Sequence, residues 1–287
     1  IYPRLKKILL LAKKHHVYIN IDAEHYNVRD AVLDIYLRTL EEIYPKADQI
    51  GRLQTGIVVQ AYLRDSYEHL NKILTWCENQ NLLMPIRLVK GAYWDAETIE
   101  AKAHSYLAPQ FLNKIETDLH FKHLVDRILA HSKHLQLVLA SHNVYDHAWA
   151  ISLQKYNYPH SLVIEHQFLH KTFEPLSLAM AQQNYCVRDY VPIGDLLVGM
   201  AYLVRRIMEN SSQVGILQQM RSDINIDEIM KQTVRLSSLV QGDSWQWDDL
   251  LGDSNESLFY NIAPVRLYME KEFLDFSRSF EKYNLLE

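Results

Sequence analysis

The run Ile86-Arg87-Leu88-Val89-Lys90-Gly91 is short, apolar and rich in β-forming residues, and it ends on a lysine and a glycine. Such a run predicts a buried strand whose last residues reach the edge of a sheet. Five other runs have the same character, at residues 17–22, 56–62, 137–143, 162–167 and 187–191. The sequence therefore predicts six strands.

The stretches between these strands carry apolar residues at helical spacing, for example Leu33, Tyr36, Leu37, Leu40 and Ile43. Alternation of strand and helix indicates right-handed crossovers and a parallel sheet. We therefore predict an α/β fold of the (β/α)8 TIM-barrel type. A closed barrel would need two further strands before residue 17, so we expect a barrel fragment that lacks its first two strands.

Composition narrows the class of protein. The chain has 287 residues, of which 48% are hydrophobic and 23% charged, as expected for a globular α/β barrel. Its formal net charge of -5 does not favour a polyanionic partner, so no nucleic-acid contact is expected. Cys77 and Cys186 lie far apart and predict free thiols in a reducing compartment. No apolar run approaches the roughly 18 residues of a membrane span.

Polar residues stand at or just beyond the ends of the predicted strands, namely Asp22, Gln60, Lys90, His142, Gln167 and Tyr190. In a parallel barrel the carboxyl ends of the strands converge on one mouth, where active sites are built. The alternative is that polar residues merely terminate strands. Because six polar residues stand at corresponding positions of six strands, we favour the interpretation that they form a catalytic face.

Residues 195–210 predict a helix with Asp195 as its N-cap. Its polar side carries Tyr202, Arg205, Arg206 and Glu209. Arginine is the preferred bidentate binder of carboxylates, and one glutamate cannot neutralise two guanidinium groups. The arginine pair therefore indicates a site for a carboxylate ligand, although a solvated charged face would show the same pattern.

The predicted strand at residues 86–91 carries two cations, Arg87 and Lys90, and then opens into aromatic residues. Gly91 would let a flat or bulky group approach the backbone. A cation next to a flavin would stabilise negative charge on the reduced ring. The alternative is an ordinary strand end with a salt bridge.

Three motifs, at residues 20–24, 87–95 and 190–210, together resemble the proline dehydrogenase family, and in particular the proline dehydrogenase domain of the bacterial bifunctional PutA proteins. The resemblance runs from the start of the chain to about residue 220. It implies a distorted barrel in residues 1–220 that binds flavin. Residues 221–287, with acidic and amphipathic stretches, are then expected to be a helical extension or linker toward a following domain.

The resemblance also implies a substrate site for L-proline. Arg205 and Arg206 would bind its carboxylate. The pocket would be lined by Ala92, Tyr93, Leu169, Tyr190 and Tyr202. Asp22 would order the pocket by hydrogen bonding. The catalytic residues implied in this way are Asp22, Arg87, Tyr190, Arg205 and Arg206.

The implied cofactor is FAD. Arg87 would lie near flavin N5, and Lys114 and Thr117 would serve the pyrophosphate and adenosine part. The other implied contacts are Gln60, Val89, Lys90, Gly91, Trp94, Ala140, Ser141, His142, Asn143, Gln167, Arg206 and Glu209.

The implied reaction is the oxidation of L-proline to Δ1-pyrroline-5-carboxylate, the first step of proline catabolism to glutamate, with electrons passed to a membrane quinone. The resemblance further implies a larger bifunctional chain in the bacterial cytoplasm, peripherally associated with the inner membrane.

Other functions remain open on the residues alone. The pairs His120 and His123, and His166 and His170, have spacings that can hold a metal, but no carboxylate or cysteine set accompanies them, so no metal site is expected. A metal-dependent hydrolase, or an aldolase that forms a Schiff base on Lys90, is the alternative enzyme. A degenerate barrel kept as a scaffold is the non-enzymatic alternative.

Overall fold

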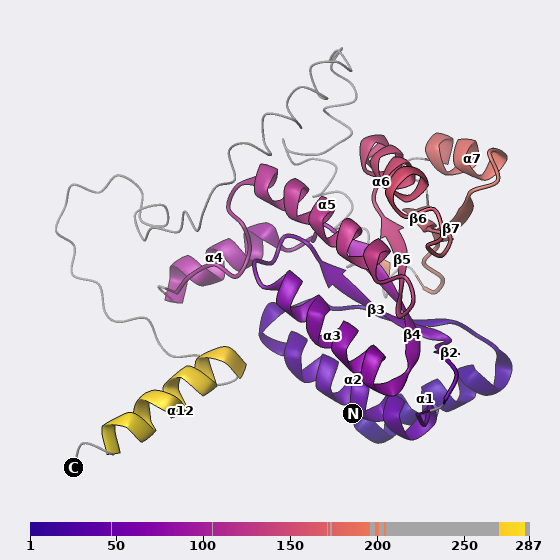
Figure 1. Cartoon of the computed structure of the whole chain (residues 1–287). Coiled ribbons are helices and arrows are strands. Elements are labelled where there is room, and N and C mark those ends of the chain that lie inside the picture. Colours follow the sequence, from indigo (N-terminus) through magenta and orange to yellow (C-terminus); the bar gives the residue numbers. More distant parts are fainter. Residues whose placement is uncertain are drawn as a thin grey trace, which may run out of the picture.

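The structure is a computed structural model that describes residues 1–46, 48–104, 106–170, 172, 174–195, 199–200, 204 and 270–284. Within this part of the chain, no helix is both long and apolar enough to cross a membrane. The described residues form one parallel sheet with helices packed around it, and a separate C-terminal helix (Figure 1).

The sheet contains all six predicted strands, in the order of the sequence and each parallel to the next. They are β1 (Ile19–Ile21), β3 (Thr55–Gln60), β4 (Leu82–Val89), β5 (Leu135–Ala140), β6 (Glu165–Leu169) and β7 (Cys186–Tyr190). The two-residue strand β2 (Gly51–Arg52) pairs with the start of β4 and was not predicted, because two residues are too few to show a pattern.

Helices lie on the outer side of the curled sheet, which makes the fold a half-barrel (Figure 1). They are α1 (Tyr2–His15), α2 (Arg29–Ile43), α3 (Ser66–Gln80), α5 (Lys114–Ala130), α6 (Val144–Asn157) and α7 (Glu174–Gln182). A further helix, α4 (Trp94–His104), lies between β4 and α5 in the sequence. A short 3-10 turn, η1 (Tyr26–Val28), leads into α2. The α/β barrel-type fold is therefore confirmed.

The core lies between the sheet and these helices. On β4, Ile86 and Leu88 are fully buried against the helices, whereas Arg87 and Val89 alternate with them and face the inner side. On α2 the predicted stripe is confirmed, with Tyr36 and Leu40 fully buried. Burial of each such side chain contributes about 1.5–3 kcal/mol to the stability of the fold. Packing on the outer face of the sheet therefore fixes the positions of the residues on its inner face.

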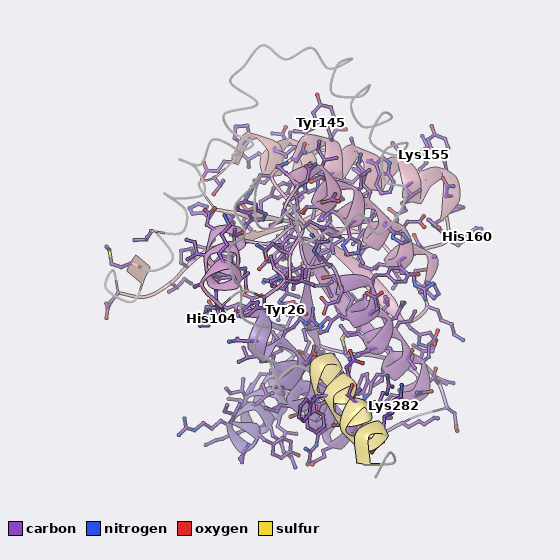
Figure 2. All side chains as sticks on the ribbon, turned by 90° about the vertical axis from the view of Figure 1, so that its left-hand side faces the viewer. Tyr26, His104, Tyr145, Lys155, His160 and Lys282 are labelled. Carbon is purple, nitrogen blue, oxygen red and sulfur yellow. The ribbon has the colours of Figure 1, made fainter. Side chains whose placement is uncertain are left out.

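The C-terminal part is described only in α12 (Glu270–Asn284), whose exposed Lys282 projects from the helix (Figure 2). Of the helix predicted at residues 195–210, Gly199, Met200 and Val204 are helical, and the Gly199 amide donates to the Asp195 carbonyl at 3.0 Å. The remainder of that prediction lies outside the described residues. The boundary near residue 220 stays a prediction.

Candidate active site

The carboxyl ends of the strands open onto a cavity of about 290 Å³. All six polar residues predicted at the strand ends line it: Asp22, Gln60, Lys90, His142, Gln167 and Tyr190. Eight further predicted site residues also line it: Arg87, Val89, Gly91, Ala92, Tyr93, Ala140, Ser141 and Leu169. The fold thus brings residues from β1 to β7 to one mouth.

The guanidinium group of Arg87 is held in place on the cavity wall. Its Nε donates to Oε1 of Gln167 at 2.8 Å, and its Nη1 pairs with Oδ1 of Asp22 at 2.5 Å. Asn20 Nδ2 donates to the same Asp22 oxygen at 2.9 Å. The salt bridge that sequence reasoning offered as an alternative is therefore present, and it fixes the orientation of a cation at the cavity.

Lys90 also reaches the cavity, but its ammonium group is engaged by two carboxylates. Nζ lies 2.6 Å from Asp118 Oδ1 and 2.9 Å from Asp146 Oδ2. Burial alone would lower the pKa of Lys90, but the Asp146 and Asp118 carboxylates outweigh it and raise the pKa. A lysine kept protonated in this way is a poor nucleophile, which argues against Schiff-base chemistry.

The same two acids connect Lys90 to its surroundings. Lys114 donates to Asp118 Oδ2 at 3.0 Å, and Ser141 Oγ donates to Asp146 Oδ2 at 2.6 Å. Burial would raise the pKa of Asp118, but Lys90 and Lys114 lower it. Neither acid was predicted as a site residue, because both belong to helices and not to the end of a strand: Asp118 lies in α5 and Asp146 in α6.

The segment after β5 is held by local hydrogen bonds. His142 Nε2 accepts the Leu169 amide N–H at 3.0 Å, so a neutral His142 carries its proton on Nδ1. Asn143 caps α6 through its side chain, which accepts from the Tyr145 amide at 3.0 Å. Asn143 therefore acts as a helix cap and does not line the cavity.

Gly91 has a positive φ of 129°, a region that favours glycine. A Cβ added there would lie 2.2 Å from the Tyr62 ring. The close approach that was expected at this glycine is present, and the group that makes it is the ring of Tyr62. Trp94 does not line the cavity, and its indole N–H donates to the Phe111 carbonyl at 2.8 Å. Thr117 is buried and also outside the cavity lining.

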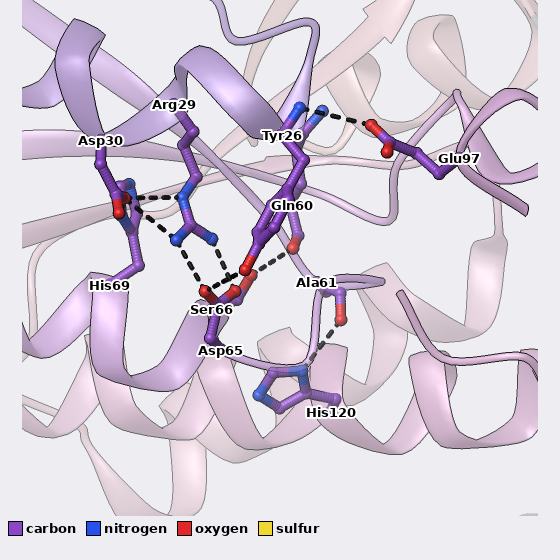
Figure 3. Close-up of polar contacts among 10 residues, drawn as sticks. All are labelled: Tyr26, Arg29, Asp30, Gln60, Ala61, Asp65, Ser66, His69, Glu97 and His120. Carbon is purple, nitrogen blue, oxygen red and sulfur yellow. Dashed lines mark hydrogen bonds and ion pairs between the residues drawn. The ribbon is translucent and has the colours of Figure 1, made fainter. Parts of the chain in front are cut away.

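The segment between β1 and α2 is anchored by polar contacts of Tyr26 and the buried Arg29 (Figure 3). Arg29 is 7% exposed and binds both oxygens of Asp65, at 2.6 and 2.7 Å. Tyr26 donates its hydroxyl to the same carboxylate at 2.9 Å, and Gln60 Nε2 donates to the Ala23 carbonyl at 3.3 Å. The end of β1 is thereby tied to the β3–α3 loop.

Histidines whose spacing could hold a metal have other partners in the structure. His147 Nε2 donates to the Ser141 carbonyl at 2.8 Å, so its Nδ1 accepts from Nδ1 of His166, also at 2.8 Å. Burial and the nearby His147 lower the pKa of His166 to about 3. His120 Nδ1 bonds the Ala61 carbonyl at 2.9 Å (Figure 3). In the described ranges, no three His, Cys, Asp or Glu residues gather in a metal-binding group.

The remaining predicted site residues, Tyr202, Arg205, Arg206 and Glu209, lie outside the described residues. Four cavity-lining residues were not predicted: Ala23, Glu24, Val58 and Phe168. The position of Val58 could have been inferred, because it stands two residues from Gln60 on the same face of β3, and Ala23 and Glu24 follow directly on Asp22. Phe168 stands between Gln167 and Leu169, so strand alternation would not have identified it.

Comparison with known proteins agrees with this arrangement. The bifunctional protein PutA of Klebsiella aerogenes is 30% identical over 242 residues, which cover 82% of this chain and 18% of that protein. Hydroxyproline dehydrogenase of Bos taurus is 26% identical over 83% of this chain and 51% of its own length. The solved structure of PutA from Bdellovibrio bacteriovorus inactivated by N-propargylglycine has a TM-score of 0.83 and 28% identity over 99% of this chain and 28% of that chain.

The chain spans less than a fifth of the length of the curated PutA protein that it matches. The family model described as proline dehydrogenase matches residues 1–219, which is most of the sequence and contains every described strand. This family generally implies a flavin cofactor and a dehydrogenase activity. By this match, the chain belongs to the proline dehydrogenase family.

Proposed function

We propose that this chain oxidises L-proline to Δ1-pyrroline-5-carboxylate with FAD as cofactor, and that the electrons pass to a quinone. The observation that carries the proposal is the fixed guanidinium group of Arg87 in a cavity built from strand ends, in a member of the proline dehydrogenase family. The product would enter the route from proline to glutamate.

The residues of the cavity fit a flavin ring. The volume of about 290 Å³ is at the lower end for a small-molecule site. Val89 and Ala140 supply apolar wall, while Gln60, Arg87 and Gln167 supply amide and guanidinium groups. A flat, partly polar ring system needs this mixture of an apolar face and hydrogen-bonding edges. We propose that Trp94, Lys114, Thr117, Asn143 and Glu209 contribute to FAD binding beyond the cavity.

When bound, FAD would supply the redox chemistry, by accepting a hydride equivalent from C5 of proline. Arg87 places positive charge at the cavity wall, where it would stabilise negative charge that develops on the cofactor. Ala92, Tyr93, Leu169 and Tyr190 would enclose the proline ring and exclude water.

The substrate carboxylate requires a separate cation, because Arg87 and Lys90 are already paired with aspartates. We propose that Arg205 and Arg206 bind it, with Tyr202 beside the ring. Asp22 would act by holding Arg87 in place. Orientation of the ring against the cofactor is the main contribution expected of these residues.

The setting of this activity is also a proposal. The curated PutA relatives are bifunctional bacterial proteins, and this chain matches only a part of each, 18% of the protein from Klebsiella aerogenes. We propose that this chain likewise works within a larger protein in the bacterial cytoplasm, peripherally bound to the inner membrane where quinone is available. Residues 1–220 would form the flavin-binding barrel, and residues 221–287 would be an extension or linker.

The test is made on the full-length gene product. Flavin released from the purified protein is identified by chromatography, and anaerobic bleaching of its absorbance is followed with L-proline, D-proline and hydroxyproline. We expect FAD, and bleaching by L-proline in preference to the others. Arg205→Ala and Arg206→Ala should each raise KM for proline strongly. Absence of flavin, or an unchanged KM in both variants, would refute the proposal.

A further inference from the structure

A closed ring of polar contacts lines the inner face of the sheet. Its members alternate along their strands, so that they share one face: Tyr18, Asn20, Asp22, Arg87, Glu165, Gln167 and Arg188. We call this set the inner-face ring. Glu165, Tyr18, Asn20 and Arg188 were not among the predicted site residues, and none of them lines the cavity.

One half of the ring leads from the mouth inward. Beyond the Arg87 contact to Gln167, Gln167 Nε2 donates to Glu165 Oε1 at 2.6 Å. Glu165 in turn accepts from Arg188, from Nε at 2.7 Å and from Nη2 at 3.0 Å. Arg87 is thereby connected to β7 through two residues of β6.

The other half returns along β1. The Arg188 guanidinium lies 5.3 Å from the centre of the Tyr18 ring, and the Tyr18 hydroxyl donates to Asn20 Oδ1 at 3.3 Å. Asn20 then donates to Asp22, which pairs with Arg87.

Small and apolar residues on the strands between make these contacts possible. Val138 of β5 is in register between Arg87 and Glu165, so Arg87 reaches over it to β6. Gly56 of β3 leaves room for Tyr18, because a Cβ there would lie 2.3 Å from the Tyr18 hydroxyl oxygen.

The orientation of the Gln167 amide is fixed from both sides. Arg87 can only donate, so it requires the amide oxygen, and an ionised Glu165 can only accept, so it requires the amide nitrogen. Burial would raise the pKa of Glu165, but hydrogen bonds from Arg188 and Gln167 lower it and keep the carboxylate ionised. Reversal of the amide would place donor against donor and acceptor against acceptor at once.

We propose that Glu165 is a positioning residue, which acts through Gln167 to fix the Arg87 guanidinium against the cofactor and balances the charge around it. This inference rests on the proposed function. The ring holds two cations, Arg87 and Arg188, and two anions, Asp22 and Glu165, so removal of the Glu165 charge leaves a net positive charge beside the cofactor site.

The test is Glu165→Gln in the full-length gene product. The flavin reduction potential should become more positive, because positive charge favours the reduced, negatively charged ring. The kcat for proline should fall about tenfold, as is common when a supporting partner is lost, with KM nearly unchanged because the carboxylate site is elsewhere. In flavin-free protein labelled with ¹⁵N-arginine, the Arg87 Nε–H should exchange faster with solvent.

Gln136→Met is the matched control. Gln136 is another inner-face glutamine, which accepts from Arg52 at 2.7 Å and donates to the Val163 carbonyl at 3.1 Å, outside the ring. This substitution should change the free energy of unfolding but leave the flavin potential, kcat and the Arg87 exchange unchanged. Glu165→Asp keeps the charge but shortens the side chain, so it should leave the potential unchanged while Arg87 exchange increases, and it replaces Glu165→Gln if that variant does not fold.

Unchanged potential, kcat and Arg87 exchange in Glu165→Gln, in a wild type that binds flavin and oxidises proline, would overturn the inference and leave the proposed function intact. A wild type that binds no flavin would instead overturn the proposed function, while the Arg87 exchange would still report whether Glu165 positions that side chain.

Discussion

Replacement of Lys90 by methionine should destabilise the protein mainly through the charge that it leaves behind. The Asp146 side chain is 4% exposed and would lose its cation, whereas Asp118 is 30% exposed and keeps Lys114. Breaking a buried ion pair costs about 3–5 kcal/mol. Because only one of the two acids is fully buried and stranded, we expect a loss near the lower limit, about 3 kcal/mol at pH 7.

The pH dependence of this loss gives its cause. The raised pKa of Lys90 means that its stabilisation is present below its ordinary value of 10.5 and fades only above it. The lowered pKa of Asp118 means that its contribution to stability is present above pH 3.8 and is lost as the pH falls further. The loss in Lys90→Met should therefore be largest between these limits, and it should shrink as pH falls below 3.8 or rises well above 10.5.

Urea unfolding followed by circular dichroism at several pH values measures this. Lys155→Met is the control, since Lys155 is exposed on α6 and points away from the ribbon (Figure 2), and it should change the free energy of unfolding by less than about 0.5 kcal/mol. A loss below about 1 kcal/mol for Lys90→Met, or one independent of pH, would show that the two carboxylates do not depend on this lysine.

Three further predictions concern the frame of the site. Gly91→Ala should cost on the order of 2 kcal/mol through backbone strain and collision with Tyr62, measured as a lower Tm together with a reduced flavin content; an unchanged Tm would contradict it. Asp65→Asn should cost about 1–3 kcal/mol, because the buried Arg29 loses its contact with two carboxylate oxygens of Asp65 but keeps its pairing with Asp30, and urea unfolding at pH 7 checks this. The pKa of His166 is lowered to about 3 from an ordinary 6.5, so between these two pH values the unfolded chain binds more protons than the folded chain. Stability should therefore fall by up to about 1.4 kcal/mol per pH unit below 6.5, and His166→Gln should flatten that slope in pH-dependent unfolding.

The strands and the mouth of the half-barrel could be predicted because both are local properties of the sequence. An apolar run ending in Lys90 or Gln167 shows where a strand stops, and parallel strands stop at one edge. The groups that hold these residues could not be predicted in the same way. Asp118 and Asp146 belong to helices, and nothing in their own segments indicates that Lys90 lies between them.

The role of Glu165 could not be predicted from the sequence either, although the residue lies close to a predicted one. It stands two residues from Gln167, so its face of the strand could be inferred, but its role depends on Arg87 and Arg188 from other strands. Gly91 is a different case: the sequence indicated a close approach to its backbone, but only the fold shows that Tyr62 makes it.

The contact of Arg188 with Tyr18 joins the first and last strands of the sheet, whose backbones do not pair with each other. The curvature of the half-barrel is therefore set partly by side chains that reach across its hollow, in addition to the twist between neighbouring strands. Within the part of the chain that the structure describes, β1 and β7 are the edge strands of the sheet, and this contact helps to set the distance between them. Any strand that pairs with β1 or β7, from this protein or another, therefore has to fit a distance between these two strands that the contact of Arg188 with Tyr18 has already set.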